Sequence, residues 1–345
     1  MWQIIGHERA VAYLNQGLST NQVSHAYLIS GPAHIGKTTL ALDFARALNC
    51  TESDPPCGMC SSCRRIPKGL HPDVHLLGED VATGDLGSGR TEISIDEVRD
   101  LRRQGSLKPF EGRRRVFIIN GAEWLSREAS NALLKTLEEP PDDTILILIS
   151  SDLALISETL RSRCQSVTLQ PLPPALVAKV VQERTSSDQA EAFLLASLSR
   201  GRLGWALQAT ENPTVLVERD AHLQRVVQLL EAPLDQRFAY AENLAQQFAK
   251  SRVNVRQELD LLEEWLEDLL RATSGRPDLA LNQTWADTLT RQASLIPIEA
   301  VVDALRLLQD ISSRLEANAN ARLALEVLML DLPWLPAAPA TEVPS

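Results

Sequence analysis

Short runs of consecutive apolar residues alternate with amphipathic stretches through the first half of the chain. Consecutive apolar positions are typical of strands buried on both faces, whereas apolar residues spaced by three and four are typical of helices. The expected strands are Ala26–Ser30, Val74–Leu77, Val116–Ile119, Ile145–Ile149 and Val167–Leu169. The expected helices are Lys37–Asn49, a helix from the capping box Ser94–Glu97 to about Gln104, and Glu128–Glu139 before Pro140. This alternation predicts an α/β domain whose parallel sheet is covered by helices.

The second half of the chain has a purely helical pattern. Three prolines between positions 171 and 174 mark the boundary with the first half. The expected parts are an α/β domain at 1–170, a small helical domain at 171–210, a larger helical domain at 211–332 and a loose tail at 333–345. Apolar stripes that begin at Leu223, Leu259 and Ile298 indicate that the larger helical domain has a core of its own.

Composition and charge limit the possible functions. Of 345 residues, 44% are hydrophobic and 23% are charged, which is ordinary for a globular protein, and the length suits two or three domains. The net charge of −11 argues against a protein that grips nucleic acid alone, because neutralising phosphates requires a basic surface. No apolar run is long enough to span a bilayer, and the N-terminus lacks the features of a secretory signal, so we expect a cytoplasmic protein.

A glycine-rich segment after the first strand is the clearest chemical motif. Gly31 to Thr38 (GPAHIGKT) fits the pattern G-x-x-x-x-G-K-[ST] and lies between an expected strand and an expected helix, the context that this pattern requires. Glycines let backbone N–H groups close around phosphate oxygens, and the helix N-terminus adds positive potential. We therefore predict ATP or ADP binding by Gly31, Gly36, Lys37, Thr38 and Thr39, with the Thr38 hydroxyl towards Mg²⁺. A chance glycine-rich turn is the alternative.

The acids that ATP hydrolysis needs are missing from the expected position. A working phosphate-loop ATPase places an acidic residue at the end of a neighbouring strand to hold Mg²⁺, usually followed by an acid that activates water. Here the strand ends in Asn120 and Gly121, and Glu123 lies three residues past the metal-binding position. Acids after other strands are the alternative, namely Asp152 and the pair Glu79–Asp80. The favoured interpretation is a site that binds nucleotide and hydrolyses it poorly.

Four of the five cysteines form a metal-binding pattern. Cys50, Cys57, Cys60 and Cys63 follow the spacing C-x6-C-x2-C-x2-C, which suits a tight chelating loop. Four thiolates complete a tetrahedral shell and leave no open position, so we predict a structural Zn²⁺ rather than a catalytic one. Free thiols or a redox pair are the alternatives, disfavoured by the spacing and by a reducing compartment. Cys164 stands apart and is expected to pack against its neighbours.

Arg163 precedes the last expected strand, in the triplet Ser162-Arg163-Cys164. An arginine at such an edge is ordinarily solvated or paired with a carboxylate. The alternative is an arginine that reaches into the ATP site of a neighbouring subunit, where it can accelerate hydrolysis by roughly 10³–10⁵. Arg161 carries the same charge two residues away.

These motifs together resemble the clamp-loader branch of the AAA+ ATPases over about residues 2–207. The phosphate loop, the cysteines and the following segments carry the resemblance: Trp2-x-x-Ile5-Gly6-His7, His25–Leu28, His71-Pro72-Asp73, Leu107–Gly112, Asn131–Pro140 and Ser162–Cys164. The segment 131–140 (NALLKTLEEP) and the Ser-Arg-Cys triplet are specific to clamp loaders, whereas the phosphate loop is not.

The resemblance implies a RecA-like (AAA+) parallel sheet domain, a small helical lid and an all-α C-terminal collar that joins five subunits into a ring. It implies that Arg163 acts in trans as an arginine finger for an adjacent motor subunit. The implied partners are other clamp-loader subunits of delta and gamma/tau type, a sliding clamp, and primed DNA reached through the complex, with no membrane. The resemblance also implies that this complex opens the clamp and closes it around primed DNA.

Two departures separate this chain from the motor subunits of that family. Motors carry Asp-Glu where this chain has Asn120-Gly121, and they carry a lid arginine in a Gly-x-x-Arg-x-Ala-Leu context where this chain has Gly204, with Arg202 close by. Both losses agree with the delta-prime type, a stator-like component of the DNA polymerase III holoenzyme. We therefore expect ATP binding with weak or absent hydrolysis. An active motor subunit of gamma/tau type is the alternative.

Overall fold

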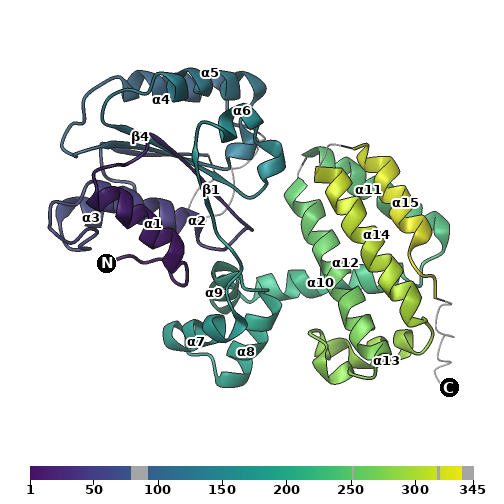
Figure 1. The fold of residues 1–345 in the computed structure, drawn as a ribbon. Helices are drawn as coiled ribbons and strands as arrows, with labels where there is room; N and C mark the ends of the chain where they lie inside the picture. Colours follow the sequence, from purple (N-terminus) through teal and green to yellow (C-terminus); the bar gives the residue numbers. More distant parts are fainter. Residues whose placement is uncertain (79–91, 251, 317–318, 336–345) are drawn as a thin grey trace. The chain divides into compact units, whose positions relative to one another are not determined.

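Five strands form one parallel sheet in the N-terminal half of the chain, in the order β2-β3-β4-β1-β5 (Figure 1). The strands are β1 (Ala26–Ser30), β2 (Val74–Gly78), β3 (Arg115–Asn120), β4 (Thr144–Ser150) and β5 (Gln165–Thr168). β1, β3 and β4 are buried at every position, as their consecutive apolar residues predicted. The predicted α/β class with a parallel sheet is confirmed.

Helices cover both faces of this sheet (Figure 1). The helices are α1 (Glu8–Ser19), α2 (Lys37–Leu48) and α3 (Ser61–Arg65) towards one face, and α4 (Ile95–Gly105), α5 (Arg127–Glu138) and α6 (Glu158–Arg161) towards the other. Successive residues of β3 enter different cores, because side chains alternate across a strand. Ile118 belongs to the cluster of Phe44 on α2, and Phe117 belongs to the cluster of Leu133 on α5. Short 3-10 turns are η1 (Ile66–Lys68), η2 (Ala122–Trp124) and η3 (Leu153–Leu155).

The helix boundaries follow local sequence signals. The predicted capping box is present at the start of α4, where the Ser94 hydroxyl accepts from the Glu97 N–H and the Glu97 carboxylate accepts from the Ser94 N–H at 2.9 Å. Ser126 caps α5 in the same way, with its hydroxyl accepting from the Ala129 N–H at 3.0 Å. α5 ends at Glu138, before the two prolines that follow.

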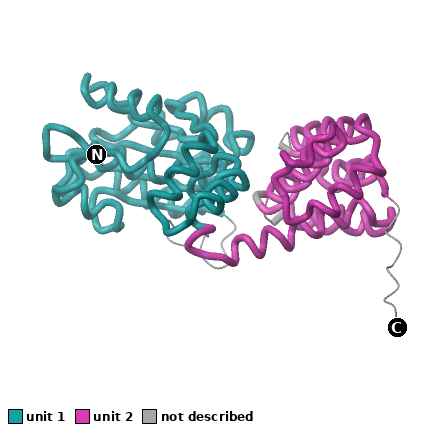
Figure 2. The backbone as a smooth tube through the Cα atoms, turned by 90° about the horizontal axis from the view of Figure 1, so that it is seen from below, with its two compact units in different colours: residues 1–208 teal, residues 209–345 magenta. Residues whose placement is uncertain are grey.

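The computed structural model describes residues 1–78, 92–250, 252–316 and 319–335. It divides the chain into two compact units, residues 1–208 and 209–345 (Figure 2). Helices α7 (Pro174–Arg184), α8 (Gln189–Leu198) and α9 (Leu203–Glu211) follow the sheet. The residues of the expected small helical domain, 171–210, fall almost entirely within the first unit, and their separation as a lid stays a prediction.

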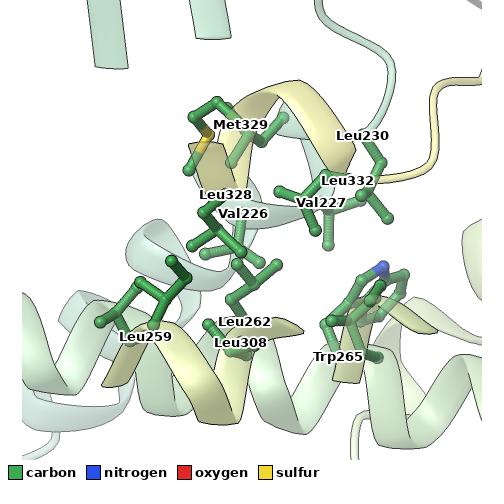
Figure 3. Close-up of a cluster of buried hydrophobic side chains, with 14 of the residues drawn as sticks. Val226, Val227, Leu230, Leu259, Leu262, Trp265, Leu308, Leu328, Met329 and Leu332 are labelled. Atoms are coloured by element: carbon green, nitrogen blue, oxygen red, sulfur yellow. The ribbon is translucent and has the colours of Figure 1, made fainter. Parts of the chain in front are cut away.

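The second unit is all-helical. Its helices are α10 (Thr214–Leu229), α11 (Leu234–Lys250), α12 (Arg252–Thr273), α13 (Ala286–Ala293), α14 (Ile298–Glu316) and α15 (Ala321–Asp331), with the turns η4 (Pro277–Leu279) and η5 (Gln283–Trp285). The predicted apolar stripes supply its core, in which Val226, Leu262 and Leu308 gather with residues of α15 (Figure 3). Trp265 is fully buried in this core and donates from Nε1 to the Gln292 side chain at 2.9 Å.

A buried arginine joins two helix ends in the second unit. Arg237 on α11 is 2% exposed, and its guanidinium donates hydrogen bonds to six backbone carbonyl oxygens. These carbonyls belong to Leu229, Leu230 and Ala232 at and just after the end of α10 and to Met329, Leu332 and Pro333 around the end of α15. Burial lowers the pKa of Arg237. The cation satisfies carbonyls that the helices leave unpaired, at the negative ends of their dipoles.

The end of the described chain differs from the expected loose tail. Leu335 is 1% exposed, and its N–H donates to the Leu230 carbonyl at 2.8 Å. The rest of the predicted tail, 336–345, lies outside the described residues. Within the described ranges, no helix is long and apolar enough to cross a membrane.

Candidate nucleotide and metal sites

The phosphate loop connects β1 to α2 at the carboxyl edge of the sheet. Gly31 has φ 145°, and a Cβ at this position would lie 2.5 Å from the Leu169 carbonyl oxygen. Gly36 has φ 103°, and a Cβ there would lie 2.6 Å from the Ile4 side chain. Both glycines of the motif are therefore required by the backbone conformation and by close neighbours.

The Lys37 side chain is turned into the loop itself. Its Nζ donates to the carbonyl oxygens of Gly31 and Pro32 at 2.8 and 2.7 Å and to the Ser151 hydroxyl at 2.9 Å. The residue is only 7% exposed. Thr38 and Thr39 lie in the first turn of α2, where backbone N–H groups point along the helix axis towards an anion.

The end of β3 carries no carboxylate at the expected position. The Thr38 hydroxyl donates to the Asn120 side-chain oxygen at 3.5 Å, so a neutral amide faces the residue predicted to approach Mg²⁺. Gly121 has φ 82°, and a Cβ there would lie 2.5 Å from Trp124 Cδ1. An acidic side chain at position 121 would therefore need both a strained backbone and a displaced tryptophan.

Glu123 lies closer to the phosphate loop than its sequence position indicated. Its Oε1 accepts from the Ser151 N–H at 2.9 Å, and Ser151 is the residue whose hydroxyl contacts Lys37. Burial raises the pKa of Glu123, against the opposing effects of hydrogen bonds and of Lys37. The sequence signal for this contact was only an acid shortly after a buried strand. The alternative acid Asp152 caps its own turn through the Ala154 N–H, and Glu79–Asp80 lie outside the described residues.

The start of α9 contacts the phosphate loop at His34. The Gly204 N–H donates to the His34 carbonyl oxygen at 2.8 Å, and a Cβ on Gly204 would lie 2.7 Å from the same oxygen. Burial lowers the pKa of His34, and the charges of Arg202 and Lys37 lower it further. The absence of a side chain at position 204 is thus a packing requirement in this chain, and Arg202 places a positive charge near the loop.

The four clustered cysteines meet in space. Their sulfur atoms all lie within 4.8 Å of one another, so Cys50, Cys57, Cys60 and Cys63 can hold a metal ion. Cys57 Sγ accepts from the N–H groups of Met59 and Cys60 at 3.4 and 3.3 Å, and these donors lower the pKa of the Cys57 thiol. Four sulfur donors with N–H groups directed at one of them fit a structural zinc ion. Cys164 is separate and buried, which raises its pKa to about 11.

Two of the family-like segments are joined through Asp73. Its carboxylate, fully buried, accepts from the N–H groups of Phe110, Glu111 and Gly112 at 2.7 to 2.9 Å and from Arg115 at 3.2 Å. Burial alone would raise the pKa of Asp73, but these donors outweigh it and hold the pKa below its ordinary value. The Asp73 carboxylate therefore fixes the loop at residues 110–112.

Arg163 is paired within its own chain. Its Nη2 lies 2.8 Å from Glu138 Oε1, and its Nη1 donates to the Thr159 carbonyl at 3.1 Å. The side chains of Arg163 and Glu138 are 35% and 51% exposed, so solvent screens this ion pair. An exposed pair of this kind costs little to break when another anion approaches.

A polar groove lies between α4 and α5. Its volume is about 760 Å³, and Glu138, the partner of Arg163, is on its wall. The basic lining residues are Arg99, Arg102, Arg103 and Lys135. Basic residues thus outnumber the two acidic lining residues, Glu138 and Glu139, although Arg99 and Arg103 are paired with Asp96 and Asp100.

Comparison with known proteins finds similarity to subunits of DNA polymerase III. A family described as "DNA polymerase III, delta subunit" matches residues 6–173. The delta-prime subunit of Bacillus subtilis (strain 168) is 27% identical over 94% of this chain and 95% of its own length. The gamma subunit of Buchnera aphidicola is 32% identical over 66% of this chain, which spans 62% of that relative's length. Among solved structures, a DNA polymerase III gamma subunit-related protein of Thermotoga maritima is 15% identical, covers 93% of this chain and 98% of its own, and has a TM-score of 0.37.

The matches and the motifs agree on the region that contains the phosphate loop, the cysteine cluster and the Ser-Arg-Cys triplet. Over this region the chain is similar to clamp-loader subunits of bacterial DNA polymerase III, and over nearly its whole length to the delta-prime subunit of Bacillus subtilis.

Proposed function

We propose that this chain is the stator-like, delta-prime type of subunit in a clamp loader, which holds nucleotide but hydrolyses it weakly or not at all. The observation that carries this proposal is the contrast at one site: the phosphate loop is complete, while the end of β3 offers Asn120 and Gly121. Because position 121 is left-handed and blocked by Trp124, the second of the two missing acids cannot be regained by a simple side-chain exchange.

Arg163 acts in trans on the ATP site of a neighbouring motor subunit in this proposal. Its exposed ion pair with Glu138 leaves the guanidinium free to exchange one anion for another. The test is ATP turnover by a reconstituted complex with delta and gamma/tau type subunits, clamp and primed DNA. Replacing Arg163 with Ala should lower turnover by at least tenfold, whereas Arg161→Ala, a matched exposed arginine, should not. Unchanged turnover in the Arg163 variant would contradict the trans role.

The proposed partners have support in two surfaces. Helix α15 is apolar on both sides, since Leu323, Val327 and Leu330 are 43–59% exposed opposite its buried face. An exposed apolar stripe opposite the buried face of a helix is typical of a surface that another protein covers, which supports assembly with other subunits through the second unit. The basic groove between α4 and α5 supports contact with DNA phosphates inside the complex.

The cysteine cluster takes a structural Zn²⁺ in this proposal. Cys50, Cys57, Cys60 and Cys63 would hold the ion, which links the end of α2 to α3 and supplies no catalytic position.

An active motor of gamma/tau type is the second candidate, favoured by the 32% identity to the Buchnera gamma subunit. Robust hydrolysis by the isolated chain that disappears in Lys37→Ala would favour this candidate over the stator. Nucleotide binding without such hydrolysis would favour the stator.

A further inference from the structure

A carboxylate reaches the phosphate loop through a two-step hydrogen-bonded link. Glu123 Oε1 accepts from the Ser151 N–H at 2.9 Å, and the Ser151 hydroxyl accepts from Lys37 Nζ at 2.9 Å. Glu123 lies in η2 after β3, while Ser151 follows β4, so the link crosses the carboxyl ends of two adjacent strands. One residue therefore separates this carboxylate from the ammonium that the motif assigns to the β- and γ-phosphates.

One oxygen of the Glu123 carboxylate lacks a hydrogen-bond donor. Its Oε2 is buried and has no hydrogen-bond partner, which is costly for an ionised group and calls for a physical reason. The pKa of Glu123 is raised by burial although Lys37 acts in the opposite direction. The positive charge of the buried Lys37 favours the ionised form of Glu123.

We propose that Glu123 is a specificity-determining residue that weakens the binding of nucleoside triphosphate relative to diphosphate. This inference rests on the proposed nucleotide binding at the phosphate loop. A γ-phosphate near Lys37 brings more negative charge towards the fixed carboxylate than a terminal β-phosphate does, and the buried position limits screening by solvent. The carboxylate thereby favours a subunit that keeps ADP or releases ATP.

The experiment is to measure ATP and ADP affinities of the full-length chain and of Glu123→Gln by calorimetry, with Mg²⁺ and with EDTA. Gln has the same shape and retains an oxygen that can accept from the Ser151 N–H, so the variant removes charge alone. We expect ATP to bind on the order of tenfold more tightly to the variant and ADP affinity to change less. Glu128→Gln, an exposed acid in the first turn of α5, is the matched control and should change neither affinity. Glu123→Met, neutral and similar in length, is the second variant if Gln lowers the melting temperature.

Three results would overturn the inference. An unchanged ratio of ATP to ADP affinity would show that the charge does not act on the terminal phosphate. Weaker ATP binding by the variant with Mg²⁺ only would show that Glu123 helps to hold the metal instead. Absence of binding by both wild type and variants would contradict nucleotide binding itself, and the inference would fall with it.

Discussion

Gly204 is the position at which the structure makes its sharpest quantitative prediction. Motor subunits are expected to carry an arginine there, yet a Cβ would lie 2.7 Å from the His34 carbonyl oxygen, where ordinary contact begins at 3.4 Å. Gly204→Ala must therefore move α9 or the phosphate loop by several tenths of an ångström. Overpacking of this size costs about 1–3 kcal/mol, and displacing the Gly204 N–H from His34 removes a further ~1 kcal/mol. The higher helix propensity of Ala relative to Gly offsets ~1 kcal/mol of this cost. We therefore expect the free energy of unfolding to fall by about 1–3 kcal/mol.

Chemical denaturation followed by circular dichroism measures this loss, and calorimetry with ADP measures its effect on the loop. Because His34 belongs to the phosphate loop, we expect ADP affinity to fall about tenfold along with stability. Gly17→Ala is the matched control: Gly17 is also a helical glycine, but its added Cβ would meet its nearest atom at 3.4 Å. The control should gain up to about 1 kcal/mol.

A Gly204→Ala variant that is as stable as wild type and binds ADP equally well would refute this prediction. That result would mean that α9 moves away from His34 without cost. Gly204→Arg extends the test, because a long side chain on the same strained Cβ should not create ATP hydrolysis. Hydrolysis gained by this single change would show that only the missing arginine, and not packing, separates this chain from a motor.

Three further predictions concern the fold and the metal. Arg237→Leu should lower the free energy of unfolding by about 3–5 kcal/mol in denaturant titrations, since six carbonyl oxygens each lose a hydrogen bond from the guanidinium; exposed Arg314→Leu should change it by less than ~1 kcal/mol. Cys60→Ser should reduce zinc content in elemental analysis and lower the melting temperature, whereas Cys164→Ser should keep the metal; equal zinc content in both variants would contradict the site. The folded-state pKa of Asp73 is below its unfolded value, so its stabilising effect is present above pH 3.8 and is lost as the pH falls through the folded pKa. The difference in free energy of unfolding between wild type and Asp73→Asn should therefore shrink as the pH falls through that range. A difference that stays constant with pH would refute this prediction.

Features encoded by neighbouring residues could be predicted from the sequence. The consecutive apolar residues of β1, β3 and β4 identified strands buried on both faces, and the Ser94–Glu97 capping box identified the start of α4. The phosphate loop was recognisable because its glycines, lysine and strand–helix context all lie within a few residues of each other. The cysteine spacing likewise predicted a cluster that the structure brings together.

Contacts between distant segments could not be predicted in this way. Glu123 lies three residues past the position of a metal-binding acid, so its spacing in the sequence does not indicate a role at the phosphate loop. Only the fold shows that η2 directs its carboxylate towards Ser151, which contacts Lys37. From the sequence, Gly204 is interpreted as the loss of an arginine that motor subunits carry. The fold shows instead a backbone contact with His34 that leaves no room for a side chain. The packing of Leu335, at the start of the expected loose tail, was hidden for the same reason, since its partner Leu230 is more than one hundred residues away.

The sequence by itself determined the parallel sheet, the phosphate-binding segment, the set of sulfur ligands and the missing acids at the end of β3, because each depends on residue type and short-range spacing. Only the tertiary structure decided which charge faces Lys37, why position 204 is glycine and what Arg237 holds together. These depend on packing between segments far apart in the chain, where a few tenths of an ångström and one buried charge outweigh any local preference.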